Sequence, residues 1–195
     1  MNPFLRSTMI VNWDHPEVLA LASYLTKQGD DPQALVTRTF NWVRDRIEYT
    51  WEYQKAALTL RASDVLVHKR GCCFAKSHLL AALLRANGIS AGFAYRVVKN
   101  ERGAFYRLHG LNTVYLPNYG WCDFDAMGDQ YGVMVPAEGA EVSASYSDGT
   151  RIKGIWPNPL SCAVGTLPDY YVKQECYYLP EQECYYHLPG KEACG

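Results

Sequence analysis

The sequence has no excess of positive charge and no long apolar segment, and each absence excludes a class of function. Its 195 residues include 19 Lys and Arg against 20 Asp and Glu, which gives a net charge of −1, and no basic stripe stands out. We therefore expect no nucleic-acid partner. No run of 18 or more apolar residues occurs, so we also expect no membrane span and no membrane partner.

The first residues lack the apolar core and the small-residue cleavage site of a signal peptide, and read MNPFLRSTMIVNWDHPE. We therefore expect a cytoplasmic protein. Seven cysteines are present, an odd number in a chain longer than most disulfide-rich secreted domains. In a reducing compartment these cysteines are expected to be free thiols.

Helical patterns dominate the first half of the chain. Apolar periodic segments begin at Pro16, two residues after Asp14, and at Pro32, directly after Asp31. They predict helices over about 16–28 and from Pro32 to about Ile47. A short helix is expected between Ser63 and Gly71. The most apolar helical pattern follows, from Cys73 to a stop at Gly88, and it predicts a central, buried helix.

Strand patterns follow this central helix. The alternation in SAGFAYRVVK, from Ser90 onward, predicts one strand. The next stretch, FYRLHGLNTVYLPNYGWCDFDA, predicts an antiparallel hairpin around a turn at residues 117–120. Residues 126–168 read as loops with one or two edge strands. The expected fold class is therefore α+β, with N-terminal helices and a central buried helix packed on an antiparallel sheet.

The length favours one domain, which we place at residues 1–168, with a tail at 169–195. The tail contains a duplicated unit, QECYYLPE at 174–181 and QECYYHLPG at 182–190. We interpret the repeat as a duplication in a mobile tail. The alternative is that its glutamines and Lys191 present themselves as acyl donor and acceptor, or that the tail folds into the cleft.

Cys73 is the strongest candidate for a nucleophile. A cysteine in the first turn of a helix faces the positive end of the helix dipole and several unbonded N–H groups, which favour the thiolate and can hold a developing oxyanion. Gly71, two residues earlier, is expected to allow a sharp backbone entry and to leave room for a substrate carbonyl. A buried, small apolar role is the alternative for Cys73, and it is the role we expect for Cys72.

A thiol nucleophile needs a base and a group that orients the base. His109 lies in a predicted strand, and Asp125 ends the partner strand, on the same face as Trp121 and Asp123. Asp123 is therefore a rival for the orienting role. With a symmetric four-residue turn, Asp125 faces Asn112 and lies about 10 Å from the level of His109, so a bulge or a longer loop is expected to close this gap.

A metal site is the competing interpretation of this region, because His68, Cys72, Cys73 and His78 occur within eleven residues. Adjacent cysteines do not easily chelate one ion, and neither a C-x-x-C nor an H-x-x-x-H spacing is present. We therefore expect no metal and no cofactor.

Two stretches of the chain resemble the transglutaminase-like superfamily: RGCCFAKSHLLAALLRANGISAGF and LHGLNTVYLPNYGWCDFDA. The resemblance covers roughly residues 14–126. In this register Cys73, twelve residues before Arg85, takes the nucleophile position, and His109 and Asp125 take the base and orienting positions. The resemblance implies a papain-like core with a buried helix against an antiparallel sheet.

The resemblance also implies acyl transfer, in which a thiolate attacks an amide or ester carbonyl and the acyl-enzyme passes to water or an amine. We expect a cysteine protease or amidase acting on a protein, peptide or small amide, with hydrolysis favoured because no additional domain is seen to hold a second protein. The alternative is a catalytically inactive relative or a peptide-binding module. The further candidates for the substrate site or the oxyanion hole are Tyr49, Trp51, Gly71, Cys72 and Trp121.

Overall fold

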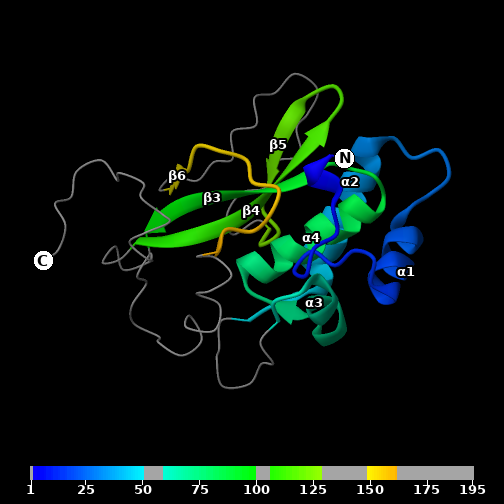
Figure 1. The fold of residues 1–195 in the computed structure, drawn as a ribbon, viewed down its shortest axis with the longest axis horizontal. Coiled ribbons are helices and arrows are strands. Elements are labelled where there is room, and N and C mark those ends of the chain that lie inside the picture. Colours follow the sequence, from blue (N-terminus) through cyan, green and yellow to red (C-terminus); the bar gives the residue numbers. More distant parts are fainter. Residues whose placement is uncertain (1, 51–58, 100–105, 129–148, 162–195) are drawn as a thin grey trace, which may run out of the picture.

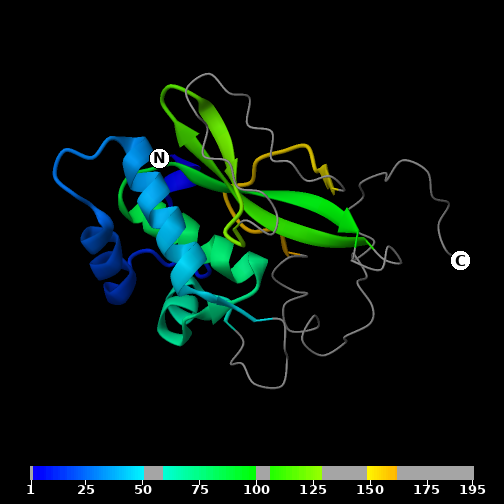
Figure 2. The same cartoon turned by 180° about the vertical axis from the view of Figure 1, so that it is seen from behind.

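The computed structural model describes residues 2–50, 59–99, 106–128 and 149–161, which form a group of helices beside a twisted sheet (Figure 1). The helices are α1 (Pro16–Leu25), α2 (Pro32–Arg46), α3 (Ala62–His68) and α4 (Cys73–Ala86), after a short 3-10 turn, η1 (Pro3–Leu5). The other three helices all contact α4, and α2 lies in front of it when the molecule is seen from behind (Figure 2).

The helix ends follow from local signals in the sequence. Both Pro16 and Pro32 lie in the first turn of their helices, and the Asp31 side chain accepts a hydrogen bond of 2.7 Å from the Ala34 N–H. The first of these helices ends at Leu25, earlier than the predicted residue 28, because the backbone at Thr26 is already extended.

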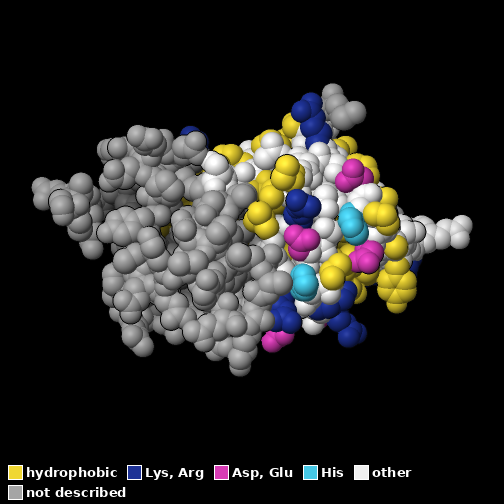
Figure 3. Space-filling view, turned by 60° about the horizontal axis from the view of Figure 1, so that its bottom comes forward, with side chains coloured by type: hydrophobic (Ala, Val, Ile, Leu, Met, Phe, Trp, Pro, Cys, Tyr) yellow, Lys and Arg dark blue, Asp and Glu magenta, His cyan; other side chains and the backbone are white. Residues whose placement is uncertain are grey.

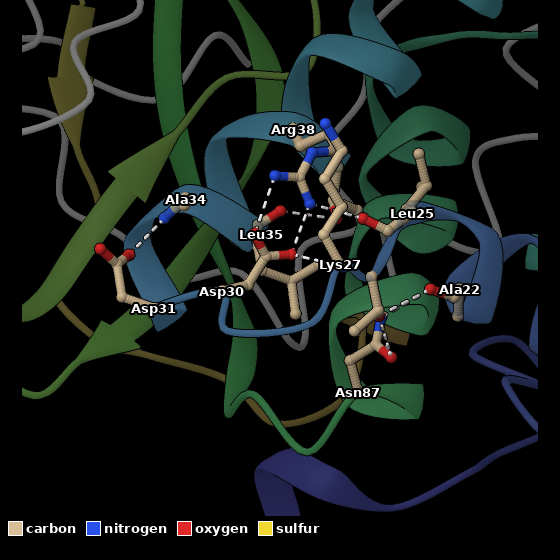
Figure 4. A network of polar contacts seen from close by, with 11 residues as sticks. Ala22, Leu25, Lys27, Asp30, Asp31, Ala34, Leu35, Arg38 and Asn87 are labelled. Carbon is tan, nitrogen blue, oxygen red and sulfur yellow. Dashed lines mark hydrogen bonds and ion pairs between the residues drawn. The ribbon is translucent and has the colours of Figure 1, made fainter.

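Polar contacts fix the connection between α1 and α2 and join it to α4 (Figure 4). Arg38 on α2 bonds both carboxylate oxygens of Asp30, at 2.5 and 2.9 Å, and also the Leu25 carbonyl at the end of α1. Asn87, just after α4, donates a hydrogen bond of 3.1 Å to the Ala22 carbonyl. The pKa of Asp30 is lowered to about 2, chiefly by its hydrogen bond with Arg38.

The main sheet has four antiparallel strands in the order β5-β4-β3-β6. They are β3 (Ala91–Lys99), β4 (Tyr106–Leu116), β5 (Gly120–Phe124) and β6 (Gly149–Arg151). A small parallel pair, β1 (Glu48–Tyr49) with β2 (Arg70–Gly71), leads into α4. The predicted fold class is therefore confirmed, and β6 is an edge strand in the region where loops and edge strands are expected.

The core lies between α4 and one face of the sheet. Every α4 residue from Phe74 to Arg85 is buried, and the aromatic rings that face it include Phe93 and Tyr95 on β3. The buried Arg85 guanidinium donates to the backbone carbonyls of Arg6, Ala91 and Pro157. It thereby joins the N-terminal segment, the start of β3 and the segment after β6 to the end of α4.

The β4–β5 hairpin has a different register from the one predicted. Leu116 pairs with Gly120, and Phe124 pairs with Asn112, so the register is shifted by one residue relative to a symmetric four-residue turn. Gly120 has a φ of +72°, a conformation that favours glycine. The predicted tail at 169–195, with its duplicated unit, lies outside the described residues.

Candidate active site

Cys73 is the first residue of α4, directly after the β2 strand and the N-cap residue Cys72. The first hydrogen bond of the helix runs from the Lys76 N–H to the Cys72 carbonyl, at 2.9 Å. The N–H groups of the first turn precede this bond and have no acceptor within the helix, so they point toward the space before the helix. The Cys73 side chain is partly exposed, whereas Cys72 is buried.

The thiol of Cys73 is held in an environment that favours its protonated form. A hydrogen bond with the Cys72 side chain, followed by burial and by electrostatic interactions with Cys72 and Asp125, raises the pKa of Cys73 well above its ordinary value. The backbone N–H of Gly110 hydrogen-bonds the sulfur and acts in the opposite direction. Cys72, burial and Asp125 therefore act against the helix terminus, which by itself favours the thiolate.

The structure brings His109 and Asp125 into direct contact. The His109 Nε2 atom lies 2.7 Å from the Asp125 Oδ2 atom, and about 5% of each side chain is exposed. The other carboxylate oxygen, Oδ1, accepts a hydrogen bond of 2.9 Å from the Met127 N–H. With both of its oxygens engaged, Asp125 has a fixed orientation toward the imidazole.

The shifted hairpin register explains how these two residues meet. β5 ends at Phe124, opposite Asn112, so the next residue, Asp125, leaves the strand at the level of Leu111. His109 lies two residues further along the same face of β4, which makes it a diagonal neighbour of Asp125 and within side-chain reach. A hairpin register shifted by one residue therefore closes the gap for which a bulge or a longer loop is predicted.

Cys73 approaches β4 at the edge that the end of β5 leaves open. The hydrogen bond between its sulfur and the Gly110 N–H places the thiol beside the residue that follows His109. Gly110 is closely packed, since a Cβ atom there would lie 2.5 Å from the Phe74 ring. The sequence gives no sign of this contact, because a glycine within a strand shows no side-chain pattern.

The rival carboxylate, Asp123, has a different partner. It accepts hydrogen bonds of 2.6 and 3.2 Å from the Arg151 guanidinium, in a two-pronged ion pair. Arg151 lies on β6 and is absent from the sequence-based candidates. The pairing of Asp123 with Arg151 and of Asp125 with His109 distinguishes two carboxylates that the alternation pattern alone leaves equivalent.

Two further candidates from the sequence, Gly71 and Tyr49, lie in the short strand pair that precedes α4. Gly71 pairs with Tyr49 across the β1–β2 pair, and a Cβ atom on Gly71 would lie 2.8 Å from the Ala75 Cβ. The space beside Gly71 is therefore filled by the first turn of α4 and is not left open for a substrate carbonyl. Trp51 lies outside the described residues.

Trp121 is not brought to this site. It pairs with Tyr115 near the hairpin turn, six residues along β4 from His109, which corresponds to about 20 Å. Its ring packs on Tyr115 and on Phe4 of the N-terminal turn, with ring centroids 5.6 and 4.7 Å away. Its contacts are those of a hairpin residue packed against the N-terminal segment.

The histidines of the competing metal interpretation do not converge on the thiols. His78 is buried on α4, and its Nδ1 atom lies 2.8 Å from the Leu60 carbonyl oxygen, while His68 is exposed at the end of α3. Within the described residues, no group of three His, Cys, Asp or Glu side chains could hold a metal ion. The described helices also include none with the length and apolar character needed to cross a membrane.

Comparisons with known proteins concern the family and the fold. A family model of the transglutaminase-like superfamily matches residues 19–126. A candidate cysteine protease from Cytophaga hutchinsonii has the same fold, with a TM-score of 0.54 and 22% identity over 65% of this chain and 41% of that one. The periplasmic domain of TgpA from Pseudomonas aeruginosa aligns with a TM-score of 0.47 and 25% identity, over 63% of this chain and 45% of that one.

The chain thus spans less than half the length of either of these solved structures. The search of the curated proteins found no match. The family model covers more than half of the chain and includes Cys73, His109 and Asp125. The chain therefore belongs to the transglutaminase-like superfamily.

Proposed function

We propose that this protein is a cysteine-dependent acyl-transfer enzyme that hydrolyses an amide or peptide bond through a thioester on Cys73. The observation that carries the proposal is the buried 2.7 Å contact between His109 and Asp125, next to a thiol at a helix N-terminus. Together these groups supply a nucleophile, a base, an orienting carboxylate and backbone donors for an oxyanion.

The raised pKa of Cys73 determines the form of the first step. Because the surroundings of Cys73 favour the protonated thiol, His109 acts as a general base when the sulfur attacks the carbonyl. The Nε2–H of His109 donates to Asp125, so the thiol proton goes to Nδ1. The new C–S bond forms as the carbonyl π electrons move to oxygen, where the first N–H groups of α4 stabilise the negative charge.

Collapse of this intermediate expels the amine, which takes the proton from Nδ1, and leaves a thioester on Cys73. Water then attacks the thioester with His109 again as base, and the thiol leaves as the carboxylic acid forms. An amine in place of water would give a new amide by the same route. The protein thus needs no group beyond its own side chains and backbone for either outcome.

A non-catalytic, peptide-binding relative that keeps the fold is the second candidate function. Incubation with a chromogenic acyl ester, followed by peptide mass spectrometry, distinguishes the catalytic function from the binding function. The catalytic proposal expects a hydroxylamine-sensitive acyl group on Cys73, absent in Cys73→Ala and greatly slowed in His109→Ala. Cys122→Ala, which changes a buried thiol on β5, serves as the matched control. No acyl group on Cys73, or equal acylation with and without His109, would contradict catalysis.

A further inference from the structure

Two side chains of α4 bind the backbone of Gly110 on β4. β5 pairs with β4 only from Asn112 to Leu116, so Gly110 lies beyond the last paired residue on that side. Its N–H donates to the Cys73 sulfur, and its carbonyl accepts from the Ser77 hydroxyl at 3.4 Å. Cys73 and Ser77 are one helical turn apart, on the same face of α4. The helix thus takes the place of a neighbouring strand at Gly110.

Asn112, two residues further along the same face of β4, makes another connection to α4. It is completely buried, and its side-chain amide donates to the Ser77 carbonyl at 2.9 Å. The same amide donates to the Gly92 carbonyl on β3, at 3.3 Å. One side chain therefore joins α4, β4 and β3, one helical turn after Cys73.

The two carbonyls that Asn112 binds also have backbone donors. Ser77 lies within α4, where its carbonyl accepts from the Ala81 N–H, and Gly92 is paired with Thr113 in the β3–β4 ladder. The Asn112 side-chain oxygen, Oδ1, has no hydrogen-bond partner among the described residues, which is unfavourable at a buried position. Backbone satisfaction therefore does not explain a buried asparagine here.

The remaining contacts of α4 do not fix its place along the sheet in the same way. Charged side chains of both signs lie interspersed with apolar ones on the part of the described surface seen in Figure 3, whereas the buried side chains of α4 are mostly apolar. The Phe74 ring, for example, packs against Tyr95. Hydrophobic burial is non-directional, but a directed hydrogen bond from a buried polar group can select one register.

We propose that Asn112 is a positioning residue, which fixes the place of α4 along β4 and thereby holds Cys73 beside His109. This inference rests on the proposed function, in which the sulfur must pass its proton to His109. Asn112→Leu removes the amide at a similar side-chain size. The protein should stay folded, with a urea midpoint close to that of the wild type, because both carbonyls keep their backbone donors and the unpartnered oxygen is lost.

The first measurement is amide hydrogen exchange of the Gly110 N–H in the full chain, which needs no activity. In Asn112→Leu this exchange should accelerate about five- to tenfold, as for the loss of one hydrogen bond, because the sulfur moves away from the N–H. Exchange of the Leu83 N–H, further along α4, should be unchanged. Thr113→Val is the matched control. It removes a buried hydroxyl without a partner among the described residues, on the opposite face of β4, and should change neither exchange rate.

The second measurement is single-turnover acylation of Cys73 by the ester substrate. In Asn112→Leu the maximal rate should fall by about 10–10²-fold, as expected for a displaced nucleophile. The ester concentration that gives half of this rate should stay within a few-fold of the wild-type value, because the substrate site keeps its side chains. Thr113→Val should resemble the wild type in both quantities. Asn112→Val is tested in the same way should the Leu variant fail to fold.

Wild-type values of both the Gly110 exchange and the maximal acylation rate in a folded Asn112 variant would overturn the inference. The same holds if Thr113→Val changes both quantities as much as Asn112→Leu does. Accelerated exchange of Gly110 in Asn112→Leu, with no acylation of Cys73 even in the wild type, would instead refute the proposed function and leave the placement of α4 by Asn112 standing.

Discussion

Asp125 contacts His109 at 2.7 Å, while Asp123, two residues earlier, is bound to Arg151. The two carboxylates come from the same segment, and each is directed to a different partner by the point at which β5 ends. Asp123 is still within the strand, opposite Thr113, whereas Asp125 has entered the following turn, in which Gly128 has a φ of +80°. The end of the strand therefore selects which carboxylate orients the candidate base.

The first prediction concerns this selection. Asp125→Ala should reduce the rate of Cys73 acylation by about 10²–10⁴-fold, because His109 loses the group that fixes its ring and its tautomer. Asp123→Ala is the matched control, since it removes an equivalent carboxylate two residues away, and its acylation rate should stay within a few-fold of that of the wild type. Equal losses in the two variants, measured with the same ester substrate, would refute the assignment.

The sequence predicts the identity of the elements better than the details of the site. Two of the helices begin at prolines, Pro16 and Pro32, and the strands follow from alternation, because these signals are local. Pairing register is not local: a shift of one residue, with Leu116 opposite Gly120, decides whether Asp125 reaches His109. The partner of Asp123 could not be predicted either, since Arg151 is brought near by a short edge strand 28 residues further along the chain.

The second prediction concerns Cys72, for which the sequence suggests packing or a place at the substrate site or the oxyanion hole. Its hydrogen bond is the largest cause of the raised pKa of Cys73. Cys72→Ala should therefore lower the pKa of Cys73, increase the thiolate fraction at neutral pH and accelerate labelling of Cys73 by iodoacetamide. The pH profile of labelling, read by mass spectrometry, should move to lower pH, whereas Cys122→Ala should leave it in place. An unchanged or slower reaction in Cys72→Ala would show that Cys72 has no such effect.

The third prediction is a pH dependence of stability that originates at His78. Burial lowers the pKa of this residue from 6.5 to about 4 in the folded protein. Between these two values the unfolded chain binds a proton that the folded protein does not, so the free energy of unfolding decreases as the pH falls. This one group should remove roughly 3 kcal/mol of stability between pH 7 and pH 4.

Urea unfolding at several pH values measures this effect of His78. His78→Gln can keep a donor toward the Leu60 carbonyl but does not titrate, so its stability should decrease less over the same pH range than that of the wild type. His68→Gln, at an exposed position on α3, should follow the wild-type curve. Parallel curves for His78→Gln and the wild type would contradict this origin of the pH dependence.

The last prediction concerns the contact that positions the first turn of α4. A Cβ atom on Gly71 would lie 2.8 Å from the Ala75 Cβ, and Cys73 lies between these two residues in the chain. Relief of this close contact is therefore expected to shift Cys73. Gly71→Ala should therefore reduce the free energy of unfolding by about 1–3 kcal/mol and slow acylation of Cys73.

Ala75→Gly removes the atom with which the new methyl group would collide, but it costs about 1 kcal/mol through the lower helix propensity of glycine. The double variant, Gly71→Ala with Ala75→Gly, should therefore be more stable than the sum of the two single changes predicts, and it should recover acylation relative to Gly71→Ala. Strictly additive changes in stability would show that these two residues do not compete for the same space. In that case the glycine before the two cysteines would need an explanation other than close packing against α4.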